Sequence, residues 1–428
     1  MELKETAKIL VLDPIHGAEV IAEELNELGK EAEVFNPYRE STYTNRLDHD
    51  LVILPVHLNP NFEIVREAVR NSIPFMTHHE AVKEIAAIKN LSDGIKVIEV
   101  TGTIGKTSVC ELICQLLKNK KVLSHTSSST RFISPDDTQI FPKLGGTPAN
   151  VLKVMEIARA RNLKPDIAVF EISLGLTGIG DVGVITSLKA DYKIAGSTKD
   201  ASAVKKASIK NFDDRSITVH QGLSDVNMSG NTFGDKDKNL WIDGNKVVFN
   251  GLRTTNSDFT TGEISFKPFD SFIETEYYKN SLEAAFCAVL SLGIPPKEIN
   301  TTISAVEGRM KLDKLKGRFL IDNSNSGTKL KFLAEIAEMA GRMSEKMILI
   351  VGEESQYVCE GVSAEELKKM VEQIASDFVE IIIVGEGFKQ KIEGKNVLFS
   401  AGLDAALEKA IKDSGEGFVI ISNVKTWR

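Results

Sequence analysis

Short runs of apolar residues alternate with amphipathic stretches along most of this chain, a pattern typical of a parallel α/β architecture. Near the N-terminus, the pattern predicts strands at 8–12, 51–55 and 72–77, and amphipathic helices at 17–29 and 62–72. Helical connections of this length allow successive strands to run parallel in one sheet. We therefore expect a small α/β domain over residues 1–91.

A second unit extends from there to about Gly308. Its apolar strands are predicted at 95–100, 166–172 and 183–188. The stretch 211–276 is polar and rich in Gly, Asn, Asp and Thr, and the tripeptide Asp-Gly-Asn at 243–245 favours a β-hairpin. We expect this stretch to be β-rich and attached to the central sheet.

The alternation resumes at Arg318. Strands are predicted at 318–324, 347–351, 380–385 and 417–422, and helices at 328–342, 363–376 and 402–413. The expected fold class is therefore α/β with three domains, of which 1–91 and 309–428 are Rossmann-like and 92–308 is central.

Composition excludes several classes of protein. The chain has 428 residues, a net charge of −8, 42% hydrophobic residues and 26% charged residues, as expected of a globular protein. No apolar run is long enough to cross a bilayer, and the first residues lack the apolar core of a signal peptide. The acidic balance disfavours broad nucleic-acid binding, and four cysteines without a CxxC pair fit a reducing cytosol. We expect a cytoplasmic protein with neither membrane nor nucleic-acid partners, and the oligomeric state stays open.

The strongest chemical signal is a glycine-rich loop between a strand and a helix. The strand at 95–100 runs into TGTIGKTS at 101–108. Gly102 and Gly105 allow backbone N–H groups to point at phosphate oxygens, Lys106 supplies a positive charge, and Thr107 offers a hydroxyl to Mg²⁺. This arrangement predicts a site for a nucleoside triphosphate.

The loop resembles the TGTxGKT motif of the Mur ligase and folylpolyglutamate synthetase superfamily. The resemblance implies a variable N-terminal substrate domain, a central P-loop ATPase domain and a Rossmann-like C-terminal domain. It also implies ATP and Mg²⁺ as cofactors, and a reaction that joins a carboxylate to an amine through an acyl phosphate. Thr103 and Ser108 belong to the expected nucleotide-binding residues of the loop.

Two further segments resemble motifs of the superfamily. LGGTPANVL at 144–152 resembles its Thr-Pro segment, which places Thr147 near phosphate and among the residues expected to contact substrate. FEISLGL at 170–176 resembles the strand end where a glutamate ligates Mg²⁺, which indicates Glu171. A carboxylate at the carboxyl end of a strand beside a P-loop is suitably placed for a hard cation.

The segment 186–209 resembles the stretch that carries a carbamylated lysine in many relatives, which gives the metal an extra carboxylate. Asp191 and Lys206 stand fifteen residues apart, as in the family, and Lys205 is the competing choice. Tyr192 stands where relatives commonly have a metal-binding histidine, which leaves a second Mg²⁺ site open.

Matches continue toward the C-terminus. The resemblance implies that Asn280 lies near adenine, that Arg309 contacts the γ-phosphate or the acyl phosphate, and that Asp322 contributes to the nucleotide site. Asn325 and Gly327 replace a histidine and a proline of the family pattern.

The N-terminal domain concentrates histidines. Five of the seven lie within the first 79 residues, and His16, His57, His78 and His79 directly follow predicted strands. Loops after parallel strands gather at one edge of a sheet, where ligands bind. We expect His16, His57 and one of His78 and His79 to converge on a substrate, and no GxGxxG motif indicates a dinucleotide there.

Several short motifs look similar to one branch of the superfamily, which makes coenzyme F(430), the nickel tetrapyrrole of methanogens. They are DPIHGAEVIAEELNELG, PVHLNP, THHEAV, DNSNSG and VGEESQYVCEG. The resemblance implies an anionic nickel tetrapyrrole as substrate, whose propionate is phosphorylated by ATP and then attacked by a meso carbon, closing a ketone ring. The alternatives are an amide ligase of the same superfamily and a nucleotide-binding scaffold without activity.

Overall fold

The computed structural model describes residues 3–40, 43, 47–189, 191–223, 230–267, 269, 271–325, 328–354 and 361–426. The chain divides into two compact units. The first consists of Met1–Lys267 with Lys279–Ile303, and the second of Pro268–Tyr278 with Ser304–Arg428. Within the described residues, no helix combines the length and the apolarity that crossing a membrane requires.

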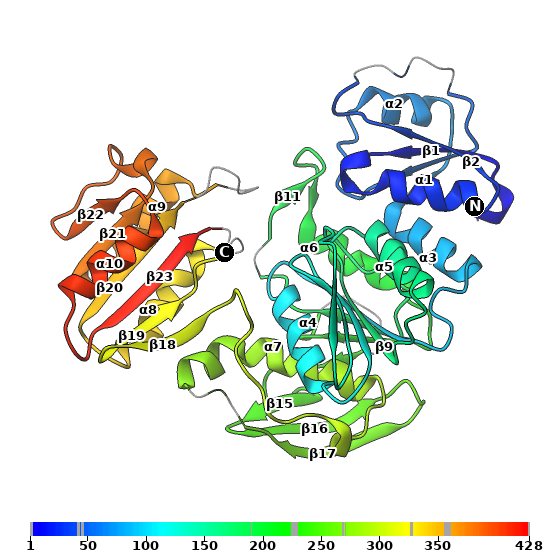
Figure 1. Ribbon diagram of the computed structural model, residues 1–428. Coiled ribbons are helices and arrows are strands. Elements are labelled where there is room, and N and C mark those ends of the chain that lie inside the picture. Colours follow the sequence, from blue (N-terminus) through cyan, green and yellow to red (C-terminus); the bar gives the residue numbers. More distant parts are fainter. Residues whose placement is uncertain are drawn as a thin grey trace. The chain divides into compact units, whose positions relative to one another are not determined.

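The first unit begins with a parallel four-stranded sheet in the order β2-β1-β3-β4. Figure 1 labels β1 and β2 of this sheet and the helices α1, α2 and α3. Its elements are β1 (Lys8–Leu12), α1 (Ala18–Glu27), β2 (Glu31–Phe35), β3 (Leu51–Leu54), α2 (Glu63–Arg70), β4 (Phe75–Thr77) and α3 (His78–Ile88). Alternate residues of β1 pack with α1 and α3 on one face and with α2 on the other. Both faces are therefore covered, which is why β1 and β3 read as continuous apolar runs.

Two details of this domain have local causes. Strand β2 has the sequence EAEVF and lies at the sheet edge, so it is mostly solvent-accessible and no apolar run predicts it. Helix α3 begins with a capping box, in which the N–H of Glu80 donates to Thr77 Oγ1 at 3.2 Å and the N–H of Thr77 donates to Glu80 Oε2 at 2.9 Å.

The central sheet has eight strands in the order β14-β13-β10-β5-β9-β6-β7-β8, with antiparallel pairing only along β6-β7-β8. The strands are β5 (Lys96–Thr101), β6 (Val122–His125), β7 (Thr130–Ile133), β8 (Thr138–Phe141), β9 (Ile167–Glu171), β10 (Val182–Ile185), β13 (Ile217–His220) and β14 (Asn231–Thr232). The helices are α4 (Lys106–Leu116), α5 (Ala149–Ala160), α6 (Ala201–Ala207) and α7 (Phe272–Ser291). A small hairpin, β11 (Lys193–Ile194) and β12 (Lys199–Asp200), precedes α6.

The polar stretch 211–276 is β-rich, as predicted, and its hairpin turns at Gly244, whose φ is +61°. The stretch is attached to the central sheet, as expected, through β13 and β14, which join that sheet. The other described strands, β15 (Leu240–Asp243), β16 (Lys246–Arg253) and β17 (Phe259–Ser265), form an antiparallel sheet of their own, and a bridge between Phe233 and Leu240 links it to the end of β14. Short connections link β15 to β16 and β16 to β17, which favours the pairing of these strands with one another.

The second unit contains a six-stranded sheet in the order β18-β19-β23-β20-β21-β22, parallel except at β18-β19. Its elements are β18 (Lys311–Leu315), β19 (Arg318–Asp322), α8 (Leu333–Gly341), β20 (Met347–Glu353), α9 (Ala364–Ile374), β21 (Glu380–Val384), β22 (Val397–Ser400), α10 (Leu403–Asp413) and β23 (Val419–Lys425). Helices α8 and α9 pack on one face and α10 on the other, the doubly wound arrangement that the pattern predicts. Helix α8 begins later than predicted, because a 3-10 turn occupies Leu330–Phe332.

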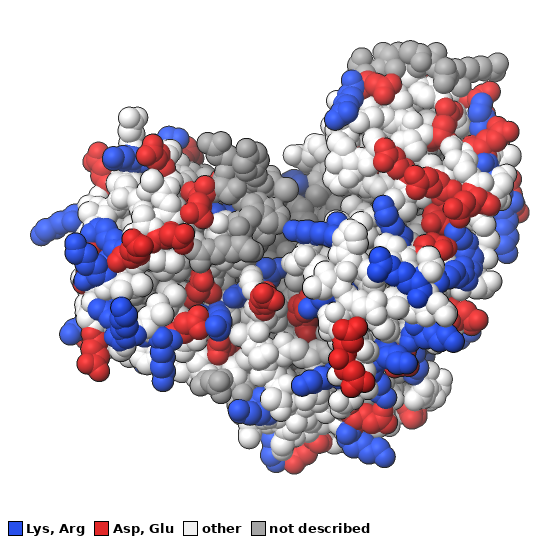
Figure 2. Space-filling view, viewed as in Figure 1, with Lys and Arg blue, Asp and Glu red and all other residues white. Residues whose placement is uncertain are grey.

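Charged side chains of both signs are interspersed over the face shown in Figure 2. This distribution matches the modest net charge of −8.

Candidate functional site

The glycine-rich loop connects β5 to α4 and packs against the end of β10. Gly102 and Gly105 have φ of +150° and +82°, which side chains rarely adopt. A Cβ at Gly102 would lie 2.0 Å from Thr186 Oγ1, so only glycine fits there. Thr103 donates two hydrogen bonds to Ser187 O, one from its N–H at 2.8 Å and one from its hydroxyl at 2.9 Å. The loop is thus held in a fixed conformation at the carboxyl edge of the sheet.

Glu171 lies at the end of β9, next to this loop. Its Oε2 accepts from Thr107 Oγ1 at 2.8 Å, from the N–H of Ser127 at 3.1 Å and from Ser127 Oγ at 3.4 Å. Glu171 is 3% and Thr107 8% exposed. Lys106 Nζ donates to Gly102 O at 3.2 Å. Two hydroxyls and a carboxylate therefore converge beside the loop, and such hard oxygen donors suit Mg²⁺.

Ser127 was not anticipated from the sequence. It follows β6, and the sheet order places β6 beside β9, the strand that carries Glu171. The pairing of β6 with β9 is between segments about 45 residues apart. The sequence offers no local motif for this neighbour.

Helix α6 carries both candidate lysines. Lys205 is 1% exposed, whereas Lys206 is partly exposed. Nζ of Lys205 donates to the hydroxyl of Tyr192 at 3.2 Å. Burial lowers the pKa of Lys205 to about 7. The positive charge of Lys106 contributes to this decrease, and the negative charge of Asp191 opposes it. Asp191 also accepts from the N–H of Ser202 at 2.8 Å in the first turn of α6.

The remaining predicted nucleotide contacts divide between the two units. Asn280 is exposed on α7 and accepts from Gln221 Nε2 at 3.0 Å, and the neighbouring Ser281 lies against Gly105. Ser108 is buried in the first turn of α4.

Arg309 and Asp322 belong to the second unit. Arg309 is partly exposed and donates to Gly308 O at 2.9 Å, and Asp322 accepts from the N–H of Ser324 at 3.0 Å. Asn325 is buried and donates to Asn323 O at 3.0 Å, and Gly327 lies outside the described residues.

Thr147 lies against the N-terminal domain. A Cβ at Gly17 would be 3.4 Å from Thr147 Oγ1 and 2.5 Å from the Cβ of Ala149. Thr147 Oγ1 is buried, and no hydrogen-bond partner for it is found among the described residues. The adjoining Gly146 accepts from the N–H of Ser173 at 2.8 Å. The loop at 144–148 therefore lies between the end of β9 and the turn that carries His16.

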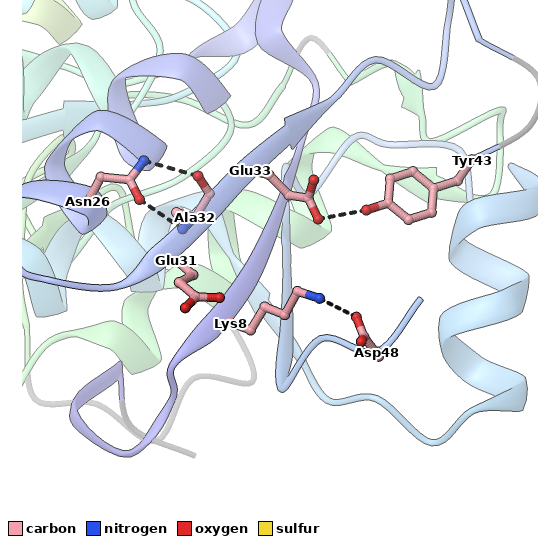
Figure 3. Close-up of a pocket in the computed structure, with 7 residues that line it drawn as sticks. All are labelled: Lys8, Asn26, Glu31, Ala32, Glu33, Tyr43 and Asp48. Carbon is pink, nitrogen blue, oxygen red and sulfur yellow. Dashed lines mark hydrogen bonds and ion pairs between the residues drawn. The ribbon is translucent and has the colours of Figure 1, made fainter. Parts of the chain in front are cut away.

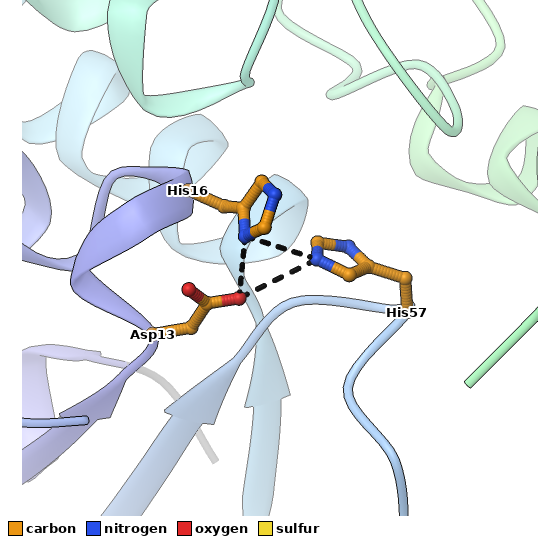
Figure 4. A group of neighbouring side chains, drawn as sticks. All are labelled: Asp13, His16 and His57. Atoms are coloured by element: carbon orange, nitrogen blue, oxygen red, sulfur yellow. Dashed lines mark hydrogen bonds and ion pairs between the residues drawn. The ribbon is translucent and has the colours of Figure 1, made fainter. Parts of the chain in front are cut away.

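His16 and His57 converge, as expected, and their third partner is Asp13 (Figure 4). Asp13 directly follows β1, His16 lies in the following 3-10 turn, and His57 follows β3. His16 Nδ1 lies 2.7 Å from Asp13 Oδ2, and His57 Nε2 lies 3.4 Å from the same oxygen and 3.2 Å from His16 Nδ1. Burial would raise the pKa of Asp13, but hydrogen bonds from both histidines outweigh it and hold that pKa well below its usual range. Asp13 was missed, although it directly follows a strand as the histidines do.

His78 and His79 do not join this cluster, contrary to the expectation that one of them would. They lie in the first turn of α3 and are 0% and 4% exposed. His78 Nε2 lies 3.0 Å from Leu12 O, and His79 Nε2 lies 3.1 Å from Ser173 O. Burial lowers the pKa of His78 to about 3 and that of His79 to about 4. Both rings are therefore neutral at physiological pH and hold backbone carbonyls.

Because His78 and His79 are buried and neutral, we expect the folded protein to lose stability in acid. An unfolded histidine has a pKa near 6.5, so below that pH the unfolded chain binds protons that the buried rings do not. Their stabilising contribution is complete above pH 6.5 and is lost as the pH falls toward 4. We expect each to reduce the free energy of unfolding by about 2 kcal/mol between pH 7 and pH 5.

Urea unfolding followed by circular dichroism at the two pH values measures this loss. His79→Gln keeps an N–H donor for Ser173 O but cannot titrate, so its unfolding midpoint should depend less on pH than that of the wild type. An equal pH dependence of the two proteins would show that His79 is not the titrating group.

Two pockets flank the N-terminal sheet. One of about 500 Å³ lies at its carboxyl edge and is shared with α6; it is lined by Val56, Thr77, His79, Thr198, Lys199 and Val204, among others. The other, of about 470 Å³, lies near the amino ends of β1 and β3, where Lys8 pairs with Asp48 and Tyr43 donates to Glu33 at 2.7 Å (Figure 3). Only the first lies on the side of the sheet where parallel α/β folds bind ligands.

The fold is the α/β architecture of the Mur ligases, with three domains and a P-loop in the central one. The MurF ligase of Thermotoga maritima in complex with ADP aligns over 98% of this chain and 92% of its own, with a TM-score of 0.56 and 15% identity. A bifunctional folylpolyglutamate synthase/dihydrofolate synthase with Mn, AMPPNP and L-glutamate bound aligns over 80% of this chain and 90% of its own, with a TM-score of 0.56 and 15% identity.

Closer relatives are found by sequence. The coenzyme F(430) synthetase of Methanosarcina acetivorans is 29% identical over 98% of this chain and 99% of its own length. That of Methanocaldococcus jannaschii is 25% identical over 90% of this chain and 93% of its own length. Residues 312–426 match the family described as Coenzyme F430 synthetase CfbE, C-terminal domain. The chain thus resembles the coenzyme F(430) synthetases over nearly its whole length.

Proposed function

We propose that this chain is an ATP-dependent ligase that activates a carboxylate as an acyl phosphate. The observation that carries the proposal is the junction of the glycine-rich loop with Glu171, where Thr107 Oγ1 and Glu171 Oε2 are 2.8 Å apart. Nucleotide phosphates bind at such a loop through backbone N–H groups and a lysine. The ADP and AMPPNP in the solved structures of the same fold support this assignment.

The residues divide the work by their chemistry. Gly102, Gly105 and Lys106 hold the triphosphate, and Thr107 with Glu171 would hold Mg²⁺, which neutralises phosphate charge when bound. The family resemblance indicates Arg309 as the source of a second positive charge for the transferring phosphoryl group. This task is mainly electrostatic, because phosphoryl transfer requires positioning and charge neutralisation more than covalent chemistry by the protein.

We further propose that Lys205 is the carbamylated lysine. The family spacing indicates Lys206, but Lys205 is the buried one and its pKa of about 7 keeps much of the amine neutral. Carbamylation requires a neutral amine, which attacks CO₂ and releases a proton. The product is a carboxylate close to the positive charge of Lys106.

The proposed substrate is the nickel seco-tetrapyrrole acid from which coenzyme F(430) is made. Its propionate receives the γ-phosphoryl group of ATP, and ADP leaves. A meso carbon of the same macrocycle then attacks the acyl carbon, the meso proton is lost and phosphate departs, leaving a ketone. The relatives named coenzyme F(430) synthetase support this choice. We place the tetrapyrrole at the carboxyl edge of the N-terminal sheet, near His16, His57 and Thr147, beside the pocket that His79 lines.

The test is ADP release with ATP and Mg²⁺, with and without the nickel seco-acid and without any amino acid. We expect ADP only with the tetrapyrrole, together with a spectral shift and a product lighter by one water. Lys106→Ala is the control, since an ADP signal that survives it comes from a contaminant. ADP that appears only with an amine and another acid would identify an amide ligase instead, and no ADP with any acid would support a nucleotide-binding scaffold.

A further inference from the structure

Asp13, His16 and His57 point one ligand atom each toward a common centre (Figure 4). The three atoms are Asp13 Oδ2, His16 Nδ1 and His57 Nε2, and their separations are 2.7, 3.2 and 3.4 Å. No residue of this cluster belongs to the P-loop or to its neighbours. The cluster is therefore separate from the proposed nucleotide site, and it lies at the sheet edge where we place the tetrapyrrole.

Two of the three separations match those of ligands on one metal ion. Two ligands at about 2.1 Å from an ion lie roughly 3.0 Å apart at a right angle and roughly 3.4 Å apart at the tetrahedral angle. The distances of 3.2 and 3.4 Å lie within this interval, and the distance of 2.7 Å between His16 Nδ1 and Asp13 Oδ2 is shorter than its lower limit. One ion can thus contact all three atoms after small side-chain shifts, with further coordination positions left open on the opposite side.

Hydrogen bonding alone leaves the cluster poorly satisfied. Two ring nitrogens share one carboxylate oxygen and also lie 3.2 Å from each other, where at most one hydrogen fits between them. Asp13 is fully buried, and its Oδ1 has no hydrogen-bond partner among the described residues. A buried carboxylate next to two imidazoles is a typical ligand set for a divalent ion, and Oδ1 offers a second oxygen to it.

The backbone around the cluster is preorganised. Asp13 O accepts from the N–H groups of His16 and Ala18, both at 3.2 Å, which closes the turn between β1 and α1. The loop that carries His57 is closed by a bond from the N–H of Leu58 to Pro55 O at 3.0 Å. Tyr38 also donates to Asp13 Oδ2 at 3.4 Å, the oxygen that faces both histidines, and so helps to orient the carboxylate.

We propose that Asp13, His16 and His57 form a binding site for a divalent transition-metal ion. Two imidazoles and one carboxylate favour ions such as Zn²⁺, Co²⁺, Ni²⁺ or Fe²⁺ over Mg²⁺ and Ca²⁺, which prefer all-oxygen sites. The ion is one outside a macrocycle, because a tetrapyrrole occupies four positions of its metal in one plane and leaves a single position on each face. Three protein ligands on one side cannot bind such a centre together. The open positions of the proposed ion suit water or a carboxylate of a small molecule.

The experiment is a titration of the full chain, stripped of metal with a chelator, with Co²⁺ followed by visible absorption. We expect one equivalent to give the d–d bands of a site with nitrogen and oxygen ligands, and Zn²⁺ but not excess Mg²⁺ to remove them. His16→Ala, His57→Ala and Asp13→Asn should each weaken Co²⁺ binding at least 10-fold. Tyr38→Phe should weaken it less, because Tyr38 acts only through Asp13.

Three controls make the result decisive. His49→Gln, which removes a histidine of the same domain outside the cluster, should bind Co²⁺ like the wild type, and circular dichroism shows which variants fold. Lys106→Ala should also retain the bands, because Lys106 is outside the cluster. The metal site is therefore tested independently of the proposed ligase activity. Absence of bands in the wild type, or bands that survive all three ligand substitutions, would overturn the proposal.

A final experiment distinguishes binding of a separate metal ion from binding of the metal in a tetrapyrrole. If the metal-free protein binds no Co²⁺ but one of its histidines becomes an axial ligand of an added nickel tetrapyrrole, the proposed site for a separate ion is wrong. Binding of Co²⁺ in the absence of any tetrapyrrole is the outcome that we expect.

Discussion

Replacing Glu171 by alanine is expected to abolish ATP turnover, lowering kcat by roughly 10³-fold, because the charge opposite the P-loop is lost at the point where phosphoryl transfer needs a bound cation. Glu171 accepts from Thr107 at 2.8 Å and is 3% exposed, so its carboxylate lies buried directly against the loop. Tetrapyrrole-dependent ADP release as a function of Mg²⁺ concentration is the measurement.

Two further variants serve as controls for Glu171→Ala. Glu171→Gln keeps an acceptor for the Thr107 hydroxyl but removes the charge, so it should lose nearly as much activity as Glu171→Ala while remaining as stable as the wild type. Glu263→Ala removes an exposed glutamate on β17, away from the P-loop, and should leave kcat unchanged. Wild-type Mg²⁺-dependent activity in Glu171→Ala would refute the metal assignment.

Lys205→Ala is expected to lower kcat by roughly 10²-fold, whereas Lys206→Ala should change it by no more than a few-fold. The difference follows from burial, since Lys205 is 1% exposed and Lys206 is partly exposed on the same helix. Kinetics of both variants, together with intact-protein mass measured with and without added bicarbonate, test the assignment. A large loss in Lys206→Ala with an active Lys205→Ala would restore the lysine that the family spacing indicates.

The pKa of Lys205 adds a pH dependence. The amine is neutral above its pKa of about 7 and becomes an ammonium below it, so carbamate formation weakens as the pH falls through 7. Activity should therefore decrease below pH 7, and added bicarbonate should restore part of it. Insensitivity to bicarbonate at pH 6.5 would argue that no carbamate forms on this residue.

Contiguous motifs could be read from the sequence. The glycine-rich loop at 101–108 is a strand, a turn and a helix start in one segment, so its chemistry is visible without knowledge of the rest of the fold. The alternation of apolar and amphipathic stretches likewise predicted most of the parallel strands. Edge strands such as β2 were not predicted, because a strand exposed to solvent does not need apolar residues.

Residues brought together by sheet order could not be read in this way. Ser127 reaches Glu171 because β6 lies beside β9, and Asp13 reaches His57 because β1 lies beside β3. The same limit applies to Lys205 and Lys206, which are adjacent in the chain but differ in burial once α6 is packed.

The sequence by itself determined the fold class, the glycine-rich loop between a strand and a helix, and the set of histidines at one sheet edge, because each depends on residue type and local spacing. Only the tertiary structure decided that Asp13, and not His78 or His79, completes the cluster with His16 and His57, and that Lys205 is the buried lysine of α6. The physical reason is that hydrogen bonds and desolvation depend on which strands and helices become neighbours, and those neighbours are distant in the chain.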